Sequence, residues 1–246
     1  DFIKYIYLLL VKSPDVVIVN PSLRRYQLFR DSIYVIIAKL FPVKVITFIH
    51  GWDDLVAQKI IAKPYYFLNS FGRSSCFFVL YSKFRKKLIE MGVKVPILLT
   101  TTKVSDELIG NFNIEMRDGS IRQILFLARI EISKGILVVL KIFSLLKLKY
   151  PYLKLSICGI GSALQDAKDY VVNNRIDDVF FHGNVSGKLL IQQFRQSDLY
   201  ILPTAHGEGM ATSILEAMAF GLPIISRPVG GICDFFLEGR MGFLLN

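Results

Sequence analysis

Short apolar runs rich in β-branched residues alternate with stretches of helical periodicity along the 246 residues of the chain. The runs that predict strands cover residues 15–20, 43–50, 76–81, 95–100, 123–130, 153–159, 179–183, 199–203 and 223–227. Helical periodicity covers residues 26–40, 82–92, 135–149, 162–175, 187–197 and 212–220. Strands that are apolar on both faces are typical of parallel sheets covered by helices. The pattern therefore predicts an α/β protein with doubly wound parallel sheets.

The pattern also predicts two domains. A polar, glycine-containing stretch at residues 116–122 follows a run, 101–115, that has no clear period. We interpret this stretch as a hinge, with one Rossmann-like domain over residues 1–117 and a second over residues 118–246. If two such domains face each other, a ligand cleft lies between the carboxyl ends of their strands.

Composition adds few constraints to this picture. Apolar residues make up 52 % of the chain, yet no run reaches the roughly 18 apolar residues that a membrane-spanning helix needs. The early segment IKYIYLLLV is short and contains Lys4, so we expect a buried element and not a signal peptide. Cys76, Cys158 and Cys233 have no metal-binding spacing, which favours reduced core thiols in a cytoplasmic protein.

The net charge of +10 is concentrated in the first half of the chain. Residues 1–117 hold 17 Lys and Arg against 9 Asp and Glu, whereas residues 118–246 hold 13 against 11. A basic half fits a solvated surface, an anionic membrane face or an anionic lipid-linked substrate. The cluster around Lys83 and Arg85 lies on a predicted helix that is either solvated or an amphipathic membrane contact. Because aromatic and basic residues do not interleave, we expect no nucleic-acid partner.

The richest candidate chemistry lies in residues 200–228, a predicted strand, loop, helix and strand. Glu208 lies in the loop and Glu216 lies one turn into the helix. Thr212 and Ser213 are good capping types and predict the start of that helix. A helix N-terminus at the mouth of a parallel sheet can bind a phosphate, and the two carboxylates could hold hydroxyl groups beside it. A sugar nucleotide carries both kinds of group.

Two cations follow the first predicted strand of the second domain. Arg129 and Lys134 lie at its carboxyl end, where ligands bind in such sheets. Arginine can hold a diphosphate with two hydrogen bonds, and lysine provides a compact charge. They could also be two surface cations at a turn, but the carboxylates predicted in the same sheet favour a diphosphate site.

Weaker signals come from glycines and histidines at other strand ends. Gly159 and Gly161 follow a strand and open a helix, which is a partial glycine-rich fingerprint or a tight turn without a ligand. His50 ends a strand before glycine and would project into the cleft, unless its role is structural. We expect His182 to be packed. The chain contains no D-x-D motif, so we expect no metal ion and no cofactor.

Taken together, these residues give the chain a resemblance to retaining glycosyltransferases of the GT-B fold, family GT4, also called glycosyl transferases group 1. The resemblance is carried by the pair Glu208-x7-Glu216, by Arg129 with Lys134-Gly135, and by the segments LEAMAFGLPII, FHGNVS, DLYILP and Val229-Gly230-Gly231. The first half is similar more loosely, through His50-Gly51-Trp52 and residues 76–92. One departure is Gly209-Met210-Ala211, where the family has Gly-Phe-Gly.

The resemblance implies a hexosyltransferase that moves a sugar from a nucleotide-diphosphate sugar to a saccharide or lipid-linked acceptor in cell-envelope synthesis. It implies catalytic roles for His50, Arg129, Lys134 and Glu208, and a donor site made of Arg129, Lys134, Gly159, Gly161, Asn184, Val185, Glu208, Gly209, Met210, Ala211, Thr212 and Glu216. The expected location is the cytoplasm, with peripheral contact to the inner membrane through the basic first half.

The resemblance also implies that the family's first βα unit and its final helices are missing from this sequence. Two other functions stay open at this point. One is a GT-B sugar-nucleotide epimerase, although the E-x7-E pair argues against it. The other is a degenerate module that binds nucleotide sugars without turnover.

Overall fold

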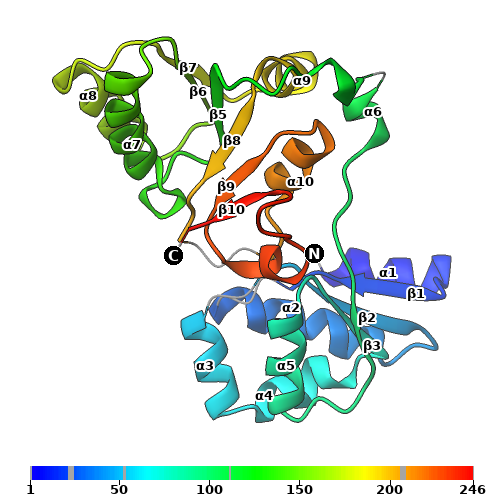
Figure 1. The fold of residues 1–246 in the computed structure, drawn as a ribbon. Helices are drawn as coiled ribbons and strands as arrows, with labels where there is room; N and C mark the ends of the chain where they lie inside the picture. The colour runs from blue at the N-terminus through cyan, green and yellow to red at the C-terminus, as the bar shows by residue number, and fades with distance from the viewer. Residues whose placement is uncertain (1, 22–24, 52–53, 111, 206–208, 246) are drawn as a thin grey trace. The chain divides into compact units, whose positions relative to one another are not determined.

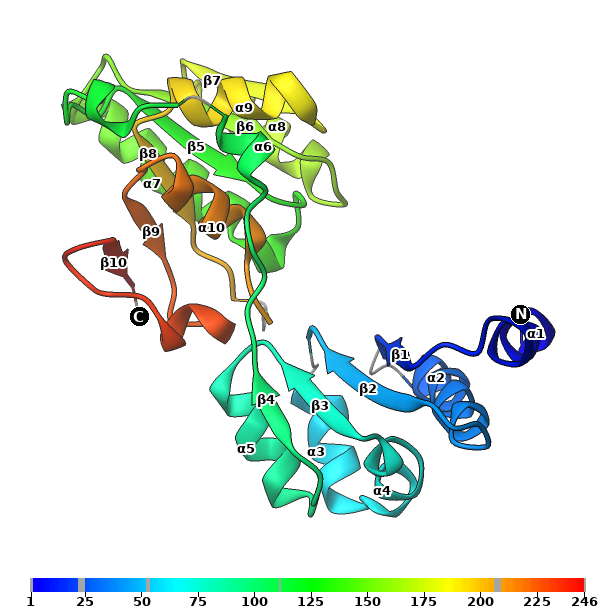
Figure 2. The ribbon, with the colours of Figure 1, turned by 90° about the vertical axis from the view of Figure 1, so that its right-hand side faces the viewer.

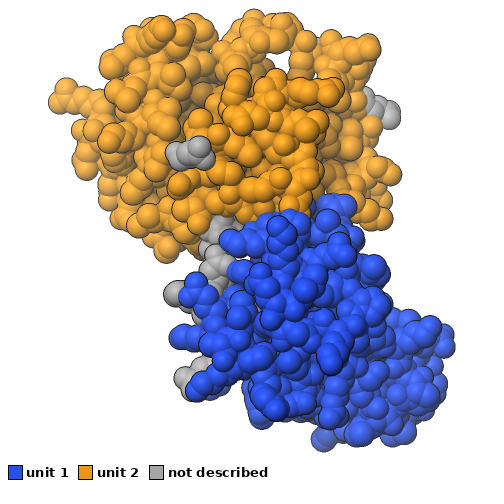
Figure 3. All heavy atoms as spheres, turned by 60° about the horizontal axis from the view of Figure 1, so that its bottom comes forward, with its two compact units in different colours: residues 1–102, 207–210 blue, residues 103–206, 211–246 orange. Residues whose placement is uncertain are grey.

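The computed structural model describes residues 2–21, 25–51, 54–110, 112–205 and 209–245, and its described elements alternate between helix and strand (Figure 1). The chain divides into two compact units, which Figure 3 shows in different colours. The first comprises residues 1–102 and 207–210, and the second comprises residues 103–206 and 211–246.

The first unit is built on a parallel sheet whose strands lie side by side in chain order (Figure 2). Its strands are β1 (Val16–Val19), β2 (Lys44–Ile49), β3 (Cys76–Val79) and β4 (Ile97–Leu99). Its helices are α1 (Phe2–Lys12), α2 (Arg25–Ala38), α3 (Asp54–Ala62), α4 (Tyr65–Ser70), the 3-10 helix η1 (Phe71–Arg73) and α5 (Ser82–Glu90). The Phe67 ring packs between Phe71 and Phe77 at centroid distances of 5.2 and 6.0 Å, which ties α4 and η1 to β3.

The first unit differs from the sequence pattern in how fully its apolar residues are buried. In β1, Val16 and Ile18 remain 44 % and 55 % exposed, and Leu98 of β4 remains 51 % exposed. The expectation of a buried element near the start of the chain is wrong. That segment is α1, whose only buried residue is Leu9, and Phe2 and Tyr5 of α1 pack on Tyr34 of α2.

The basic cluster on α5 has the arrangement of a solvated amphipathic helix. Phe84 and Leu88 are buried against the sheet, while Lys83 and Arg85 are not buried. The apolar side chain of Ile89 is also exposed, at 56 %.

The second unit is built on a parallel sheet with the strand order β10-β9-β8-β5-β6-β7. Its strands are β5 (Gln123–Leu127), β6 (Lys154–Cys158), β7 (Val179–Gly183), β8 (Leu199–Leu202), β9 (Ile224–Ser226) and β10 (Gly242–Leu244). Its α-helices are α6 (Asp106–Ile109), α7 (Ile136–Lys149), α8 (Leu164–Asn173), α9 (Gly187–Gln196) and α10 (Thr212–Ala219). Three short 3-10 helices are η2 (Ile114–Met116), η3 (Ile132–Lys134) and η4 (Gly230–Asp234).

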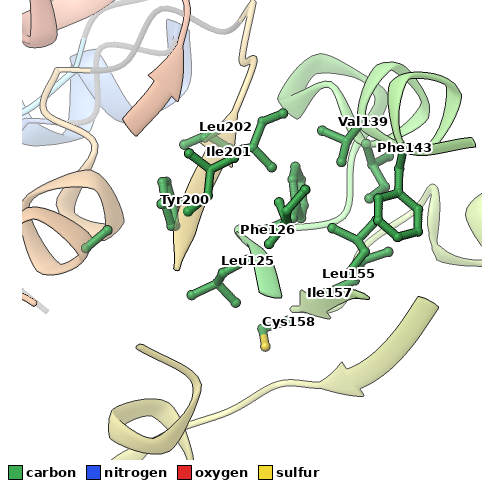
Figure 4. Close-up of a cluster of buried hydrophobic side chains, with 14 of the residues drawn as sticks. Leu125, Phe126, Val139, Phe143, Leu155, Ile157, Cys158, Tyr200, Ile201 and Leu202 are labelled. Carbon is green, nitrogen blue, oxygen red and sulfur yellow. The ribbon is translucent and has the colours of Figure 1, made fainter. Parts of the chain in front are cut away.

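Helices cover both faces of this second sheet. In Figure 1, α7 and α8 lie on one side of β5, β6 and β7, and α9 lies on the other. In the core shown in Figure 4, Val139 and Phe143 of α7 pack with Leu155 and Ile157 of β6. Because successive strand residues point to opposite faces, uninterrupted apolar runs such as that of β5 fill the core on both sides. The predicted strands of both units are confirmed within a few residues at each end.

The two units divide after Thr102, whereas the sequence pattern placed the boundary after Arg117. Residues 103–117 pack with the second unit because Arg117 joins two of its helix ends. The Arg117 guanidinium donates hydrogen bonds to the carbonyl oxygens of Phe194, Ser197 and Phe220. These carbonyl groups lie at the ends of α9 and α10, where helices leave acceptors unpaired. Arg117, in the polar stretch 116–122, therefore anchors this stretch within the second unit.

Candidate functional site

The candidate site lies where the strands of the second sheet reach their carboxyl ends. Here the loop that follows β5 is docked on the loop that follows β8. The Ala205 N–H donates to the Ser133 carbonyl at 2.8 Å. Gly135 has φ +82°, and a Cβ atom there would lie 2.6 Å from the Pro203 carbonyl oxygen. Only glycine therefore allows the two loops to approach this closely.

The two predicted cations both lie in the loop after β5, in different environments. The Arg129 side chain is 63 % exposed and forms an ion pair with Glu131 at 2.6 Å. Lys134 is only 6 % exposed, and burial lowers its pKa; the charge of Arg129 lowers it further, while Glu131 partly opposes this. A buried cation beside a second cation can stabilise an anion strongly, because little solvent screens the charges. Glu131 was not predicted, since its role is visible only once the loop is folded.

The glycines after β6 hold the backbone against this same loop. The Ile130 N–H donates to the Ile160 carbonyl at 2.9 Å, and the Ala163 N–H donates to the Ile130 carbonyl at 2.9 Å. A Cβ atom at Gly159 would lie 1.9 Å from the Ala128 carbonyl oxygen, and one at Gly161 would lie 2.3 Å from that of Ile130. The glycines are thus required for loop packing, and a contact with phosphate stays a prediction.

Gly159→Ala should destabilise the protein by about 2 kcal/mol, because backbone must shift to remove the clash. Gly159 also has φ +139°, which alanine rarely adopts. The measurement is urea unfolding followed by circular dichroism. Gly187→Ala is the matched control, since φ there is +55° but a Cβ atom would have no neighbour within 4 Å. Equal losses in both variants would show that strained backbone alone, and not the close approach, accounts for the effect.

The end of β7 lies beside the glycine turn. The Gly159 N–H donates to the Gly183 carbonyl at 2.6 Å. Asn184 follows as an exposed residue and Val185 as a half-buried one. These two predicted donor-site residues therefore lie at the same edge of the sheet as Arg129 and Lys134.

The helix predicted to bind phosphate is α10, and its capping differs from the prediction. Ala211 occupies the N-cap position, and no side-chain cap is found among the described residues. Thr212 is the first helical residue and is exposed. The Ser213 hydroxyl instead accepts a hydrogen bond from Tyr200 at 2.7 Å. The first turn of α10 therefore keeps backbone N–H groups for a ligand.

Tyr200 is a positioning residue that the sequence analysis missed. It is fully buried, and its hydroxyl lies 2.9 Å from the Leu127 carbonyl as well as within hydrogen-bond distance of Ser213. It thus ties the carboxyl end of β5 to the first turn of α10. Burial is the largest cause of its raised pKa, and the charge of Glu216 contributes. In sequence it is one more apolar strand residue, and no local signal marks this role.

Glu216 is half-buried one turn into α10, as predicted. Burial raises the pKa of its carboxyl group. The other predicted carboxylate, Glu208, lies outside the described residues. Gly209 is buried and Met210 is half-buried, and both are grouped with the first unit.

His50 follows β2 in the first unit, as the pattern predicted. Its Nε2 atom lies 3.0 Å from Oδ1 of Asn20, and its ring lies 3.9 Å from the Phe48 ring, measured between centroids. Partial burial lowers its pKa, which favours the neutral imidazole. Asn20 was not predicted, because its contact with His50 joins the ends of two neighbouring strands.

Three further observations concern metals, membranes and thiols. Within the part of the chain that the structure describes, no three His, Cys, Asp or Glu side chains gather as a metal site would require. Among the described helices none is both long and apolar enough to cross a bilayer. Cys76, Cys158 and Cys233 are all unpaired, but Cys233 is exposed and so is not the core thiol that the sequence suggested.

The chain is similar in sequence to known proteins. The family described as Glycosyl transferases group 1 matches residues 105–246. The D-inositol 3-phosphate glycosyltransferase of Arthrobacter sp. (strain FB24) is 33 % identical over 129 residues, which are 50 % of this chain and 30 % of that protein. The amylovoran biosynthesis glycosyltransferase AmsK of Erwinia amylovora is 25 % identical over 217 residues, 84 % of this chain and 52 % of its own.

Solved structures agree on the fold. The pneumococcal O-GlcNAc transferase GtfA, crystallised with UDP and GlcNAc, matches with a TM-score of 0.69 at 16 % identity. The match covers 98 % of this chain and 47 % of that one. The expected fold class, two parallel α/β units of the GT-B type, is confirmed. The chain spans about half or less of the length of these relatives.

Proposed function

This chain belongs to the glycosyl transferases group 1 family, and we propose that its protein transfers a hexosyl group from a nucleotide-diphosphate sugar to a saccharide or lipid-linked acceptor. The observation that carries the proposal is the shared edge of the second sheet. Lys134, Arg129 and the first turn of α10 all lie at this edge, with Glu216 directly behind that turn. The arrangement combines positive charge for a diphosphate with a carboxylate for hydroxyl groups.

In the proposed reaction the second unit stabilises the leaving nucleoside diphosphate. Lys134 and Arg129 neutralise the negative charge that develops as the bond to the sugar breaks, and the N–H groups of α10 bind a phosphate oxygen. The ion pair with Glu131 holds Arg129 in place until the diphosphate competes for it. These groups are fixed before the reaction, so little reorganisation is needed in the transition state.

The remaining assignments complete the proposal. Glu216 accepts hydrogen bonds from the ribose hydroxyls, and backbone at Asn184 and Val185 meets the base. Glu208, Gly209 and Met210 contact the donor sugar, and His50 lies beside the transferred sugar and acceptor. We propose retention of the anomeric configuration through attack on the same face as the leaving group, without a metal ion.

We further propose a role in cell-envelope polysaccharide synthesis in the cytoplasm, with peripheral contact to the inner membrane. The excess of basic residues in the first half of the chain and the cations of α5 support this. The name of the AmsK relative, an amylovoran biosynthesis glycosyltransferase, is consistent with it.

Thermal unfolding of the chain with UDP, GDP, ADP or TDP tests the donor site. At about 100 times its dissociation constant, one of these nucleotides should raise the unfolding midpoint by about 5–10 °C. Glu216→Gln should abolish this shift, because it removes the charged acceptor for the ribose. Because the pKa of Glu216 is raised in the folded protein, its ionised form lowers the stability of the fold as the pH rises through the titration of this group. Glutamine carries no charge, so Glu216→Gln should remain folded at pH 7.

Glu238→Gln, at an exposed position of the same unit, is the matched control and should keep the shift. A shift that survives in Glu216→Gln would place nucleotide binding elsewhere. Nucleotide binding without sugar transfer to any acceptor would favour a binding module over a transferase.

A further inference from the structure

A second hollow in the same unit has no role in the proposed reaction. It has a volume of about 260 Å³ and lies between α9 and the face of β5, β6 and β7 that this helix covers. It extends from Gln123 and Lys154, which begin β5 and β6, to His182 near the end of β7, and none of its lining residues is assigned to the donor site. Figure 1 shows α9 and the three strands whose residues line it.

The floor of the hollow is a chain of hydrogen-bonded side chains from three adjacent strands. The Gln123 amide donates to the Ser156 hydroxyl at 2.8 Å, and this hydroxyl lies 3.0 Å from Nε2 of His182. Ser156 is 5 % exposed, while His182 is exposed and not packed as the sequence suggested. Since each side chain fixes the next, the polar groups are held in place before any ligand arrives.

The wall of the hollow contains a side-chain amide whose polar atoms are open to it. Gln193 on α9 is 8 % exposed and lines the hollow. Among the described residues its side-chain amide makes no hydrogen bond, although it offers two donors and an acceptor. The donors and the acceptor of this amide are therefore available to a molecule that enters the hollow. A water molecule is the simplest occupant, and a hydroxyl-rich molecule is the larger one.

The other lining residues favour a sugar. Phe180 is 43 % exposed and provides an apolar ring, and Gln196 adds a second amide from the same helix. Amides that can donate and accept match the paired hydroxyl groups of a pyranose, and an aromatic ring matches its C–H face. We propose that this hollow is an accessory saccharide-binding site, which takes one neutral or acidic sugar residue, with Lys154 available for a carboxylate.

The test is NMR titration of the ¹⁵N-labelled chain with glucose, galactose, N-acetylglucosamine and glucuronate. At least one sugar should shift the resonances of Gln193, Ser156 and His182 in a saturable way. Gln193→Leu should weaken that binding about tenfold, which corresponds to the loss of one or two hydrogen bonds. Gln192→Leu is the matched control, because Gln192 is its neighbour on α9 and does not line the hollow.

Three results would overturn the proposal: no saturable shift with any sugar, equal binding in Gln193→Leu and Gln192→Leu, or the same shifts with inorganic phosphate alone. The first would leave water as the occupant, and the last would mark an anion site. UDP added to the same samples reports on the donor site separately. The accessory site does not rest on the proposed transferase reaction, so the two can fail independently.

Discussion

Lys134→Met is expected to lower the rate of sugar transfer about 10²–10³-fold, the usual effect of removing one preorganised charge from a transition state. Lys134 is 6 % exposed in the loop after β5, so its charge acts on the diphosphate with little screening. Methionine keeps the length and apolar stem of lysine and removes only the ammonium group. The measurement is kcat/KM for the donor that thermal unfolding identifies.

The stability of this variant should not fall. Burial lowers the pKa of Lys134 below its ordinary value of 10.5, so the unfolded chain binds the proton more tightly than the folded chain. Stability therefore rises with pH through that window, and at pH 7 the charged side chain is a cost that methionine removes. By the same reasoning, as the pH is raised the wild-type rate should begin to decline before pH 10.5 is reached, because Lys134 loses its proton.

Lys141→Met serves as the control, because Lys141 is exposed on α7 in the same unit. It should change neither the rate nor the pH profile. If Lys134→Met kept near-normal turnover while remaining folded, the buried lysine would be a structural residue and the diphosphate would bind elsewhere.

Arg117→Met is expected to destabilise the second unit by about 3–5 kcal/mol, since three carbonyl oxygens lose a charged donor at once. Two of these bonds are 2.8 and 3.0 Å long, to Phe220 and Phe194. The guanidinium also lies 5.2 Å from the centre of the Phe112 ring, a geometry that adds attraction between cation and aromatic ring. Burial of the guanidinium lowers its pKa, and the charge of Asp198 opposes this.

Thermal and urea unfolding of Arg117→Met measure this loss, which should lower the midpoint by about 2–4 °C for each kcal/mol. Arg122→Met is the control, because the Arg122 side chain is 65 % exposed and pairs with the exposed Asp118. It should cost less than about 1 kcal/mol. Arg117→Lys should remain nearly as unstable as Arg117→Met, since one ammonium group cannot reach three separate carbonyl groups. Full stability in Arg117→Lys would mean that charge alone, and not the planar fork, joins the helix ends.

Much of the fold could be predicted from the sequence, because the pattern of apolar and polar residues indicates where strands and helices form. The apolar run QILFLARI predicted β5, and the helical periodicity of the stretch that follows predicted α7. The strand β10 was missed, because Gly242–Leu244 is too short for a period to be visible. Site residues such as Lys134 and Glu216 could be predicted from the sequence for another reason. Each follows a strand or opens a helix, and the carboxyl edge of a parallel sheet is where ligands bind.

The missed parts of the site share a different property. Tyr200 reaches Ser213 and Leu127, 13 and 73 residues away in the sequence, and no local pattern encodes such a contact. The predicted helix start at Thr212 is confirmed, but the capping role is not: Ala211 is the N-cap residue, and the Ser213 hydroxyl bonds Tyr200. The burial of α1 was also predicted wrongly. Apolar residues show that a helix could be buried, but they do not show which elements pack against it.

The anchoring of Arg117 has a practical consequence for recombination between relatives. A hybrid protein would join the first unit of one relative to the second unit of another. A junction after Arg117 would combine this arginine with α9 and α10 of another protein, so its hydrogen bonds would depend on helix ends of a different sequence. A junction after Thr102 keeps Arg117, α6 and η2 with α9 and α10, so the second unit would be exchanged together with this anchor.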